Sequence, residues 1–142
     1  MIKIRVTGSA RARRKLKKLA KTTPDAVAYA MMRFGEILMD ASIDRTPVAT
    51  GELRDSAYVS PPMRRGFFQI VELGYGADYA PEVHERTEKS LRSGEPKFLQ
   101  KAVMTEARGQ LGQLAVWATA YIKRNASAPS RGRYPARPKG GS

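Results

Sequence analysis

Apolar side chains recur along residues 24–45 at the spacing of an α-helix, and this pattern constrains the fold more than any other stretch. They follow one another at intervals of four, three, four and three residues, as one face of a helix requires. The members of this stripe are Val27, Met31, Phe34, Leu38 and Ala41. Thr23 can cap such a helix and Pro24 suits its first position, whereas Pro47 stops it. We predict a helix over residues 24–45 that buries the stripe.

A second stripe with the same spacing runs through residues 97–124. Its members are Leu99, Val103, Ala107, Leu111, Leu114, Ala118 and Tyr121. Gly109 and Gly112 lie within it, and each costs a helix about 1 kcal/mol relative to alanine. We therefore predict one long helix here, stabilised by packing against the rest of the domain.

The segments before and between these helices have the pattern of β-strands. Residues 2–6 alternate between β-branched and basic side chains, and residues 67–75 are apolar nearly throughout. In residues 52–60, Leu53, Ala57 and Val59 are expected to face the core, with Arg54, Ser56 and Tyr58 on the other face. Pro61-Pro62 ends that strand, and residues 63–66 are expected to form an exposed turn. The predicted fold is α+β: a small antiparallel sheet, comprising the 52–75 hairpin and the N-terminal strand, packed against two long helices.

Charge is strongly segregated along the chain. The net charge is +13, yet residues 22–122 carry 11 bases against 13 acids. The excess lies in two acid-free segments, one near each end. Their bases are Arg11, Arg13, Arg14, Lys15, Lys17, Lys18 and Lys21, and Lys123, Arg124, Arg131, Arg133, Arg137 and Lys139. We predict a single domain over residues 1–124, with a basic helix at residues 9–21, followed by a basic, flexible or extended tail at residues 125–142.

The two basic segments have three possible roles. Lysine and arginine runs usually face water, but they can also contact nucleic-acid phosphates, and such contact would follow charge rather than base sequence. Alternatively, the segments dock on acidic surfaces of neighbouring protein subunits. The residues assigned a hypothetical position near DNA are Arg11, Arg13, Arg14, Lys15, Lys17, Lys18, Lys123, Arg124, Arg131, Arg133, Arg137 and Lys139.

The sequence contains few residues that could carry chemistry. His84 is the single histidine, and although Glu82 and Glu85 are close in sequence, no second histidine or any cysteine can complete a typical metal site. The pair Gly74-x-Gly76 lacks the third glycine of a dinucleotide-binding loop. No stretch of 18 apolar residues is present, which predicts no membrane span. We expect no catalytic residues, cofactor or metal. A nuclease-like enzyme is the least supported alternative.

Three sequence elements resemble those of the tail-completion proteins found in the neck of tailed phages. TPVATGELRDS at residues 46–56 resembles the family element T-P-V-D-T-G-x-L-R-x-S, with Ala49 in place of the aspartate. Residues 74–83 resemble G-x-x-x-x-Y-A-x-x-V. HER at residues 84–86, followed by a gapped loop and PKFLQKA at residues 96–102, resembles H-E-R … G-x-x-K-F-L-x-x-A. Together these elements extend over roughly residues 24–122, leaving the two basic ends unmatched.

The resemblance implies a small, non-catalytic α+β subunit of the head–tail joint. Such proteins form sixfold or twelvefold rings between the portal-side connector proteins and the tail terminator and tail tube proteins, and packaged DNA passes through the joint. The chain would be made in the host cytoplasm and located in the virion. Exposed turns and loops would then contact neighbouring subunits. The hypothetical interface residues are Arg64, Arg65, Tyr79, His84, Glu85, Arg86, Leu91 and Arg92. A small basic protein that binds nucleic acid non-specifically is the alternative; its DNA affinity would fall steeply with salt.

Overall fold

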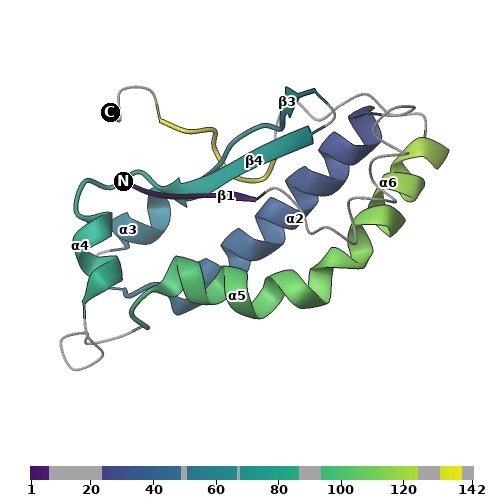
Figure 1. The fold of residues 1–142 in the computed structure, drawn as a ribbon. Helices are drawn as coiled ribbons and strands as arrows, with labels where there is room; N and C mark the ends of the chain where they lie inside the picture. Colours follow the sequence, from purple (N-terminus) through teal and green to yellow (C-terminus); the bar gives the residue numbers. More distant parts are fainter. Residues whose placement is uncertain (7–23, 49–50, 67, 87–93, 125–131, 139–142) are drawn as a thin grey trace.

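The chain folds into a small antiparallel sheet with helices packed against it (Figure 1). The computed structural model describes residues 1–6, 24–48, 51–66, 68–86, 94–124 and 132–138. The strands are β1 (Ile2–Val6), β2 (Ala57–Val59), β3 (Met63–Arg65) and β4 (Phe68–Tyr75). The helices are α2 (Pro24–Arg45), α3 (Glu52–Asp55), α4 (Ala80–Glu85), α5 (Phe98–Leu111) and α6 (Gln113–Lys123). The predicted α+β class is confirmed. The predicted helix at residues 9–21 lies outside the described residues.

β4 is the central strand of the sheet. Over the described residues the order is β1-β4-β2, and β3 pairs with the first part of β4. All pairs are antiparallel: Ile2 is opposite Tyr75, Ala57 is also opposite Tyr75, and Met63 is opposite Ile70. β2 and β3 therefore pair with successive parts of β4, separated by the residues around Pro61-Pro62.

α2 lies between the sheet and the pair α5 and α6 (Figure 1). Its stripe residues Val27, Met31, Phe34 and Leu38 are buried, as the periodicity predicts, whereas the last member, Ala41, is half-buried. Gly35 faces the sheet, because a Cβ there would lie 2.8 Å from Val71 Cγ1. The glycine thus allows α2 to pack closely against β4.

The long C-terminal helix predicted from residue 97 is two helices. α5 ends at Leu111 and α6 begins at Gln113, with a turn at Gly112. Glycine has a low helix propensity, so the axis bends there at little cost while both helices stay packed on α2. Tyr121 of α6 stacks on Tyr29 of α2, with ring centroids 4.8 Å apart.

The predicted strand at residues 52–60 is also divided. Gly51 has φ +82°, and the chain then forms the short helix α3, which buries Leu53, before β2 begins at Ala57. Tyr58, predicted to face away from the core, is fully buried because residues of the sheet and the C-terminal end cover it. Residues 63–65, predicted to form a turn, form the exposed strand β3.

Candidate functional site

The described residues of the 46–56 motif, 46–48 and 51–56, form a corner that ties α2 to α3 and β4. The Tyr75 hydroxyl lies 2.8 Å from both Ser42 Oγ and Thr46 Oγ1, and all three residues are buried. The Arg54 guanidinium donates to the Thr46 carbonyl from Nε at 3.2 Å and Nη2 at 3.0 Å. The described part of this motif is therefore structural, and it holds the end of α2 against the sheet. Ala49 lies outside the described residues.

The motif residues on either side of positions 87–93 also serve the fold. Phe98, Leu99 and Ala102 are fully buried at the start of α5. The Lys97 N–H donates to the His84 carbonyl at 2.7 Å, and Lys97 itself has φ 52°. This bond joins α4 to the beginning of α5.

His84 is a packed side chain. Its ring meets Phe98 edge-on, with centroids 5.0 Å apart, and only 7% of the residue is exposed. Nδ1 lies 3.0 Å from Glu85 Oε1, while Nε2 is buried with no hydrogen-bond partner among the described residues. The ring is therefore packed within the domain, and the contact of His84 with a partner stays a prediction.

The other predicted interface residues divide into exposed and undescribed ones. Arg64 and Arg65 are exposed on β3, and Tyr79, Glu85 and Arg86 are exposed around α4. Arg86 Nη2 forms an ion pair with Glu82 Oε1 at 2.9 Å, one helical turn away. Leu91 and Arg92 lie outside the described residues.

The predicted DNA-proximal residues have different surroundings. Lys123 and Arg124 are exposed at the C-terminal end of α6. Arg133 and Arg137 are also exposed, but both form ion pairs within the chain. The remainder lie outside the described residues: Arg11, Arg13, Arg14, Lys15, Lys17, Lys18, Arg131 and Lys139.

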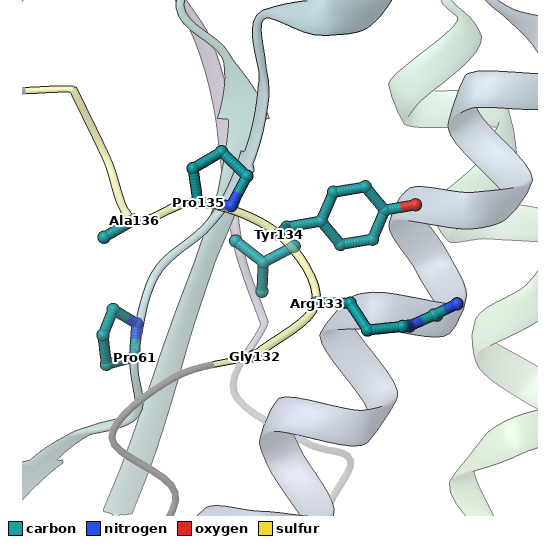
Figure 2. Close-up of a pocket in the computed structure, with 7 residues that line it drawn as sticks. Pro61, Gly132, Arg133, Tyr134, Pro135 and Ala136 are labelled. Carbon is teal, nitrogen blue, oxygen red and sulfur yellow. The ribbon is translucent and has the colours of Figure 1, made fainter.

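The C-terminal segment, defined here as residues 132–138, docks on acidic side chains of α2. Figure 2 shows Arg133 and Tyr134 pointing toward this helix. The Arg133 N–H donates to Glu36 Oε1 at 2.7 Å, and its guanidinium pairs with both Glu36 and Asp40. The Tyr134 hydroxyl donates to Asp40, and burial together with this carboxylate raises the tyrosine pKa.

The same segment continues along the edge of the sheet. The Val59 N–H donates to the Pro135 carbonyl at 3.1 Å, which occupies part of the outer edge of β2. A cavity of about 230 Å³ lies beside this contact, lined by Val59, Pro61 and residues 132–136 (Figure 2). The cavity is small and its described lining holds no catalytic constellation.

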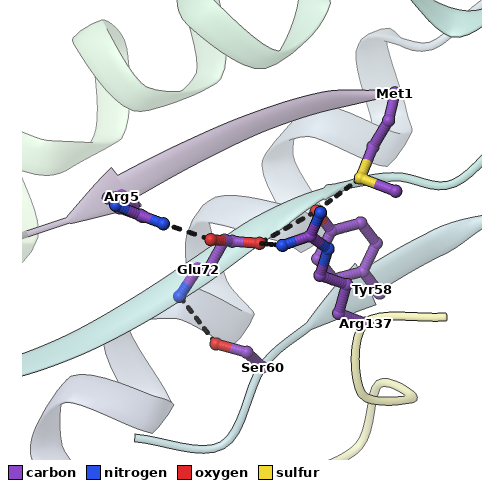
Figure 3. A network of polar contacts seen from close by, with 6 residues as sticks. All are labelled: Met1, Arg5, Tyr58, Ser60, Glu72 and Arg137. Carbon is purple, nitrogen blue, oxygen red and sulfur yellow. Dashed lines mark hydrogen bonds and ion pairs between the residues drawn. The ribbon is translucent and has the colours of Figure 1, made fainter. Parts of the chain in front are cut away.

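Glu72 forms the last anchor, on the outer face of the sheet (Figure 3). Its carboxylate lies 3.2 Å from Arg5 Nε, 3.6 Å from Arg137 Nη1 and 3.3 Å from the Tyr58 hydroxyl. Burial and the nearby Glu72 charge raise the pKa of Tyr58 to about 12. Glu72 thus joins β1, β2 and the C-terminal segment.

Sequence reasoning missed the three carboxylates that hold the C-terminal segment, which are Glu36, Asp40 and Glu72. A signal was present in part: Glu36 and Asp40 are one helical turn apart, and the acid-free C-terminal end carries the complementary charge. No sequence pattern showed that these two acids contact the C-terminal segment, because the contacting residues are 93 to 97 positions apart in the sequence.

The described residues offer no group of three histidine, cysteine, aspartate or glutamate side chains placed to hold a metal ion. None of the helices in that part of the chain is both long and apolar enough to span a membrane.

One family model matches the chain, over residues 10–85 and thus more than half of its length. The model is described as "Bacteriophage HK97-gp10, putative tail-component". No characterised protein and no solved structure shows a significant match. The match includes α2, the 46–56 corner, the hairpin and α4.

Proposed function

Since this chain belongs to the HK97-gp10-like family of bacteriophage tail components, we propose that it is a structural protein of the phage neck. In this proposal it is a tail-completion or head–tail connector subunit that forms a sixfold or twelvefold ring. The ring joins the DNA-filled head to the tail, between the portal-side connector proteins and the tail terminator and tail tube proteins. The family match is the observation that carries the proposal.

The distribution of exposed residues supports a role in assembly. The family-like motif residues Thr46, Leu53, Phe98 and Leu99 are buried and maintain the fold. Arg64 and Arg65 project from a short strand at the surface, where they are available to a neighbouring protein. We propose that strand β3 and the exposed side of α4 contact other subunits.

Proximity to DNA is a further part of the proposal. Lys123 and Arg124 are exposed, and a ring would gather their copies around one axis. Arg133 and Arg137 have carboxylate partners in the chain, so they contribute less to such a lining than their formal charge suggests.

Electron microscopy of particles made with and without the gene tests the proposed function. Without the gene, we expect filled heads and completed tails that remain unjoined, and expression from a plasmid should restore joined particles. The neck assignment would be wrong if particles made without the gene were joined normally and if an immunoblot did not detect the chain in purified wild-type particles.

The net charge of +13 favours one alternative, a small basic protein that binds nucleic acid non-specifically. That function requires the free protein to bind DNA with an affinity that decreases steeply between roughly 50 and 200 mM salt. A DNA titration at these two salt concentrations distinguishes it, because a neck protein needs no such affinity before assembly.

A further inference from the structure

Residues 132–138 lie on a surface that includes Glu36 and Asp40 of α2, Val59 of β2 and Glu72 of β4, and we call this surface the groove. Glu36 and Glu72 are 7% and 3% exposed, and a buried carboxylate is costly without a partner. The C-terminal segment supplies partners for both: the amide and guanidinium of Arg133 for Glu36, and the guanidinium of Arg137 for Glu72. The segment thus supplies one partner of each carboxylate, and Glu72 also has Arg5 and the Tyr58 hydroxyl beside it.

Close backbone packing at both ends of the groove points the same way. A Cβ on Gly76 would lie 2.9 Å from Pro138 Cγ. A Cβ on Gly132 would lie 2.1 Å from Met32 Cε and 2.5 Å from Glu36 Oε1. Glycines thus allow the segment and the groove to approach each other at these two points.

Nothing in these contacts requires that the segment and the groove belong to the same chain. The anchoring partners are on α2, β2 and β4, whereas the segment follows α6 in sequence, and α6 packs on α2. Seven residues, 125–131, connect Arg124 to the segment. Fully extended, they would reach about 25 Å, enough to cross to a neighbouring subunit packed against α6.

We propose that in the assembled ring the groove of each subunit receives residues 132–138 of a neighbouring copy. This inference rests on the proposed ring-forming function. The exchange keeps every contact described above, because donor and acceptor sequences are identical, and so it costs little. Two arginines then meet three carboxylates across the subunit boundary, and each subunit is tied to the next by its own chain.

A disulfide test can determine which chain fills the groove, because the protein contains no cysteine. Gly76→Cys and Pro138→Cys are introduced together, where the ideal Cβ at position 76 already touches the proline ring. The protein is assembled, oxidised and run on a denaturing gel without reductant, while light scattering gives its oligomeric state. Gly109→Cys, exposed on α5, is the control for chance collisions.

Covalent multi-chain products from the double variant, absent from the control and removed by reductant, are the expected result. An oligomer that yields only single chains with an internal disulfide would overturn the exchange and leave the neck function intact. A chain that is monomeric in solution and missing from particles would overturn the neck function, and the exchange with it.

Charge inversion gives a second test if the cysteine variant does not fold. Asp40→Arg places two positive charges at the Asp40–Arg133 contact, and Arg133→Glu places two negative charges there. In a mixture of the two variants, opposite charges meet only when the segment of one chain lies in the groove of the other. We expect neither variant to assemble alone and the mixture to assemble. The double variant Asp40→Arg/Arg133→Glu should assemble by itself. Failure of the mixture while the double variant assembles would show that the segment stays in its own chain.

Discussion

At the scale of single residues, Glu72 shows how this small domain tolerates a buried charge. The carboxylate is 3% exposed but has Arg5, Arg137 and Tyr58 around it. Each partner comes from a different part of the chain, so the charge is compensated only in the folded state. Glycines have an equally specific role: a Cβ on Gly74 would lie 2.0 Å from the Ile2 carbonyl oxygen of β1.

Gly74→Ala should therefore destabilise the protein by about 1–3 kcal/mol, because β1 must move away from β4 to accommodate the methyl group. Gly109→Ala is the matched control: a Cβ there meets nothing within 4 Å, so the substitution should stabilise α5 by up to about 1 kcal/mol. Urea unfolding of both variants measures the difference. Equal stabilities would show that β1 does not pack as described.

Tyr58 should make the protein sensitive to alkali. Its pKa is raised from 10 to about 12 in the folded state, so the unfolded chain loses this proton first as the pH rises. The contribution of protonated Tyr58 to the free energy of unfolding is fully present below pH 10. It is lost between about pH 10 and 12, by at most about 1.4 kcal/mol per pH unit.

Unfolding free energies of wild type and Tyr58→Phe, measured across this pH range, isolate the effect of that one tyrosine. The decline should be shallower in the variant, which has no phenol to ionise at position 58. Parallel curves would contradict the assignment, since Tyr75, Tyr121 and Tyr134 also have raised pKa values and are present in both proteins.

At the scale of secondary-structure elements, α2 is contacted by one tyrosine from the sheet and another from α6, and the two contacts differ in kind. Tyr75 of β4 reaches the C-terminal end of α2 with its hydroxyl, which lies 2.8 Å from Ser42 and from Thr46. Tyr121 of α6 stacks on Tyr29 of α2, but its buried hydroxyl has no hydrogen-bond partner among the described residues. The first contact is polar and the second is mainly apolar.

Removing the two hydroxyls should have opposite consequences. Tyr75→Phe leaves the Ser42 and Thr46 hydroxyls without a shared partner and should cost about 1–2 kcal/mol. Tyr121→Phe removes a buried polar atom that lacks a hydrogen bond, so stability should be unchanged or increased. Thermal denaturation compares the pair. A larger loss for Tyr121→Phe would mean that its hydroxyl has a partner outside the described residues.

At the scale of the whole molecule, the exposed arginine and lysine residues divide into two sets with different roles. Arg133 and Arg137 join the C-terminal segment to the domain, whereas Arg64, Arg65, Lys123 and Arg124 remain exposed. In a phage tail component, the exposed set is the one available to other virion proteins or to DNA.

Reversing charge on β3 tests the proposed contact with partners. Arg64→Glu/Arg65→Glu should leave the unfolding temperature within a few degrees of wild type, because both side chains are exposed. Phage titre should fall, with unjoined heads and tails visible by electron microscopy. Arg108→Glu, exposed on α5, is the control. Wild-type titre in the double variant would exclude β3 from the joint.

The sequence by itself determined the elements whose signals are local. The stripe of α2 and the alternation in β1 depend on neighbours two to four residues apart, and both elements appear where predicted. The motif residues around Thr46 and Gly74 likewise indicate the family that the match over residues 10–85 shows, and both residues are buried.

Tertiary structure alone decided the features that join distant residues. Tyr58 is buried because the outer face of its strand is covered, and Glu36 is buried because Arg133, 97 residues away, supplies its hydrogen bond. Periodicity cannot predict contacts between distant residues, since it indicates only which face of an element is apolar. The C-terminal segment has no periodicity, so its sequence does not predict the contacts by which complementary charge and close glycine packing hold residues 132–138 against the domain.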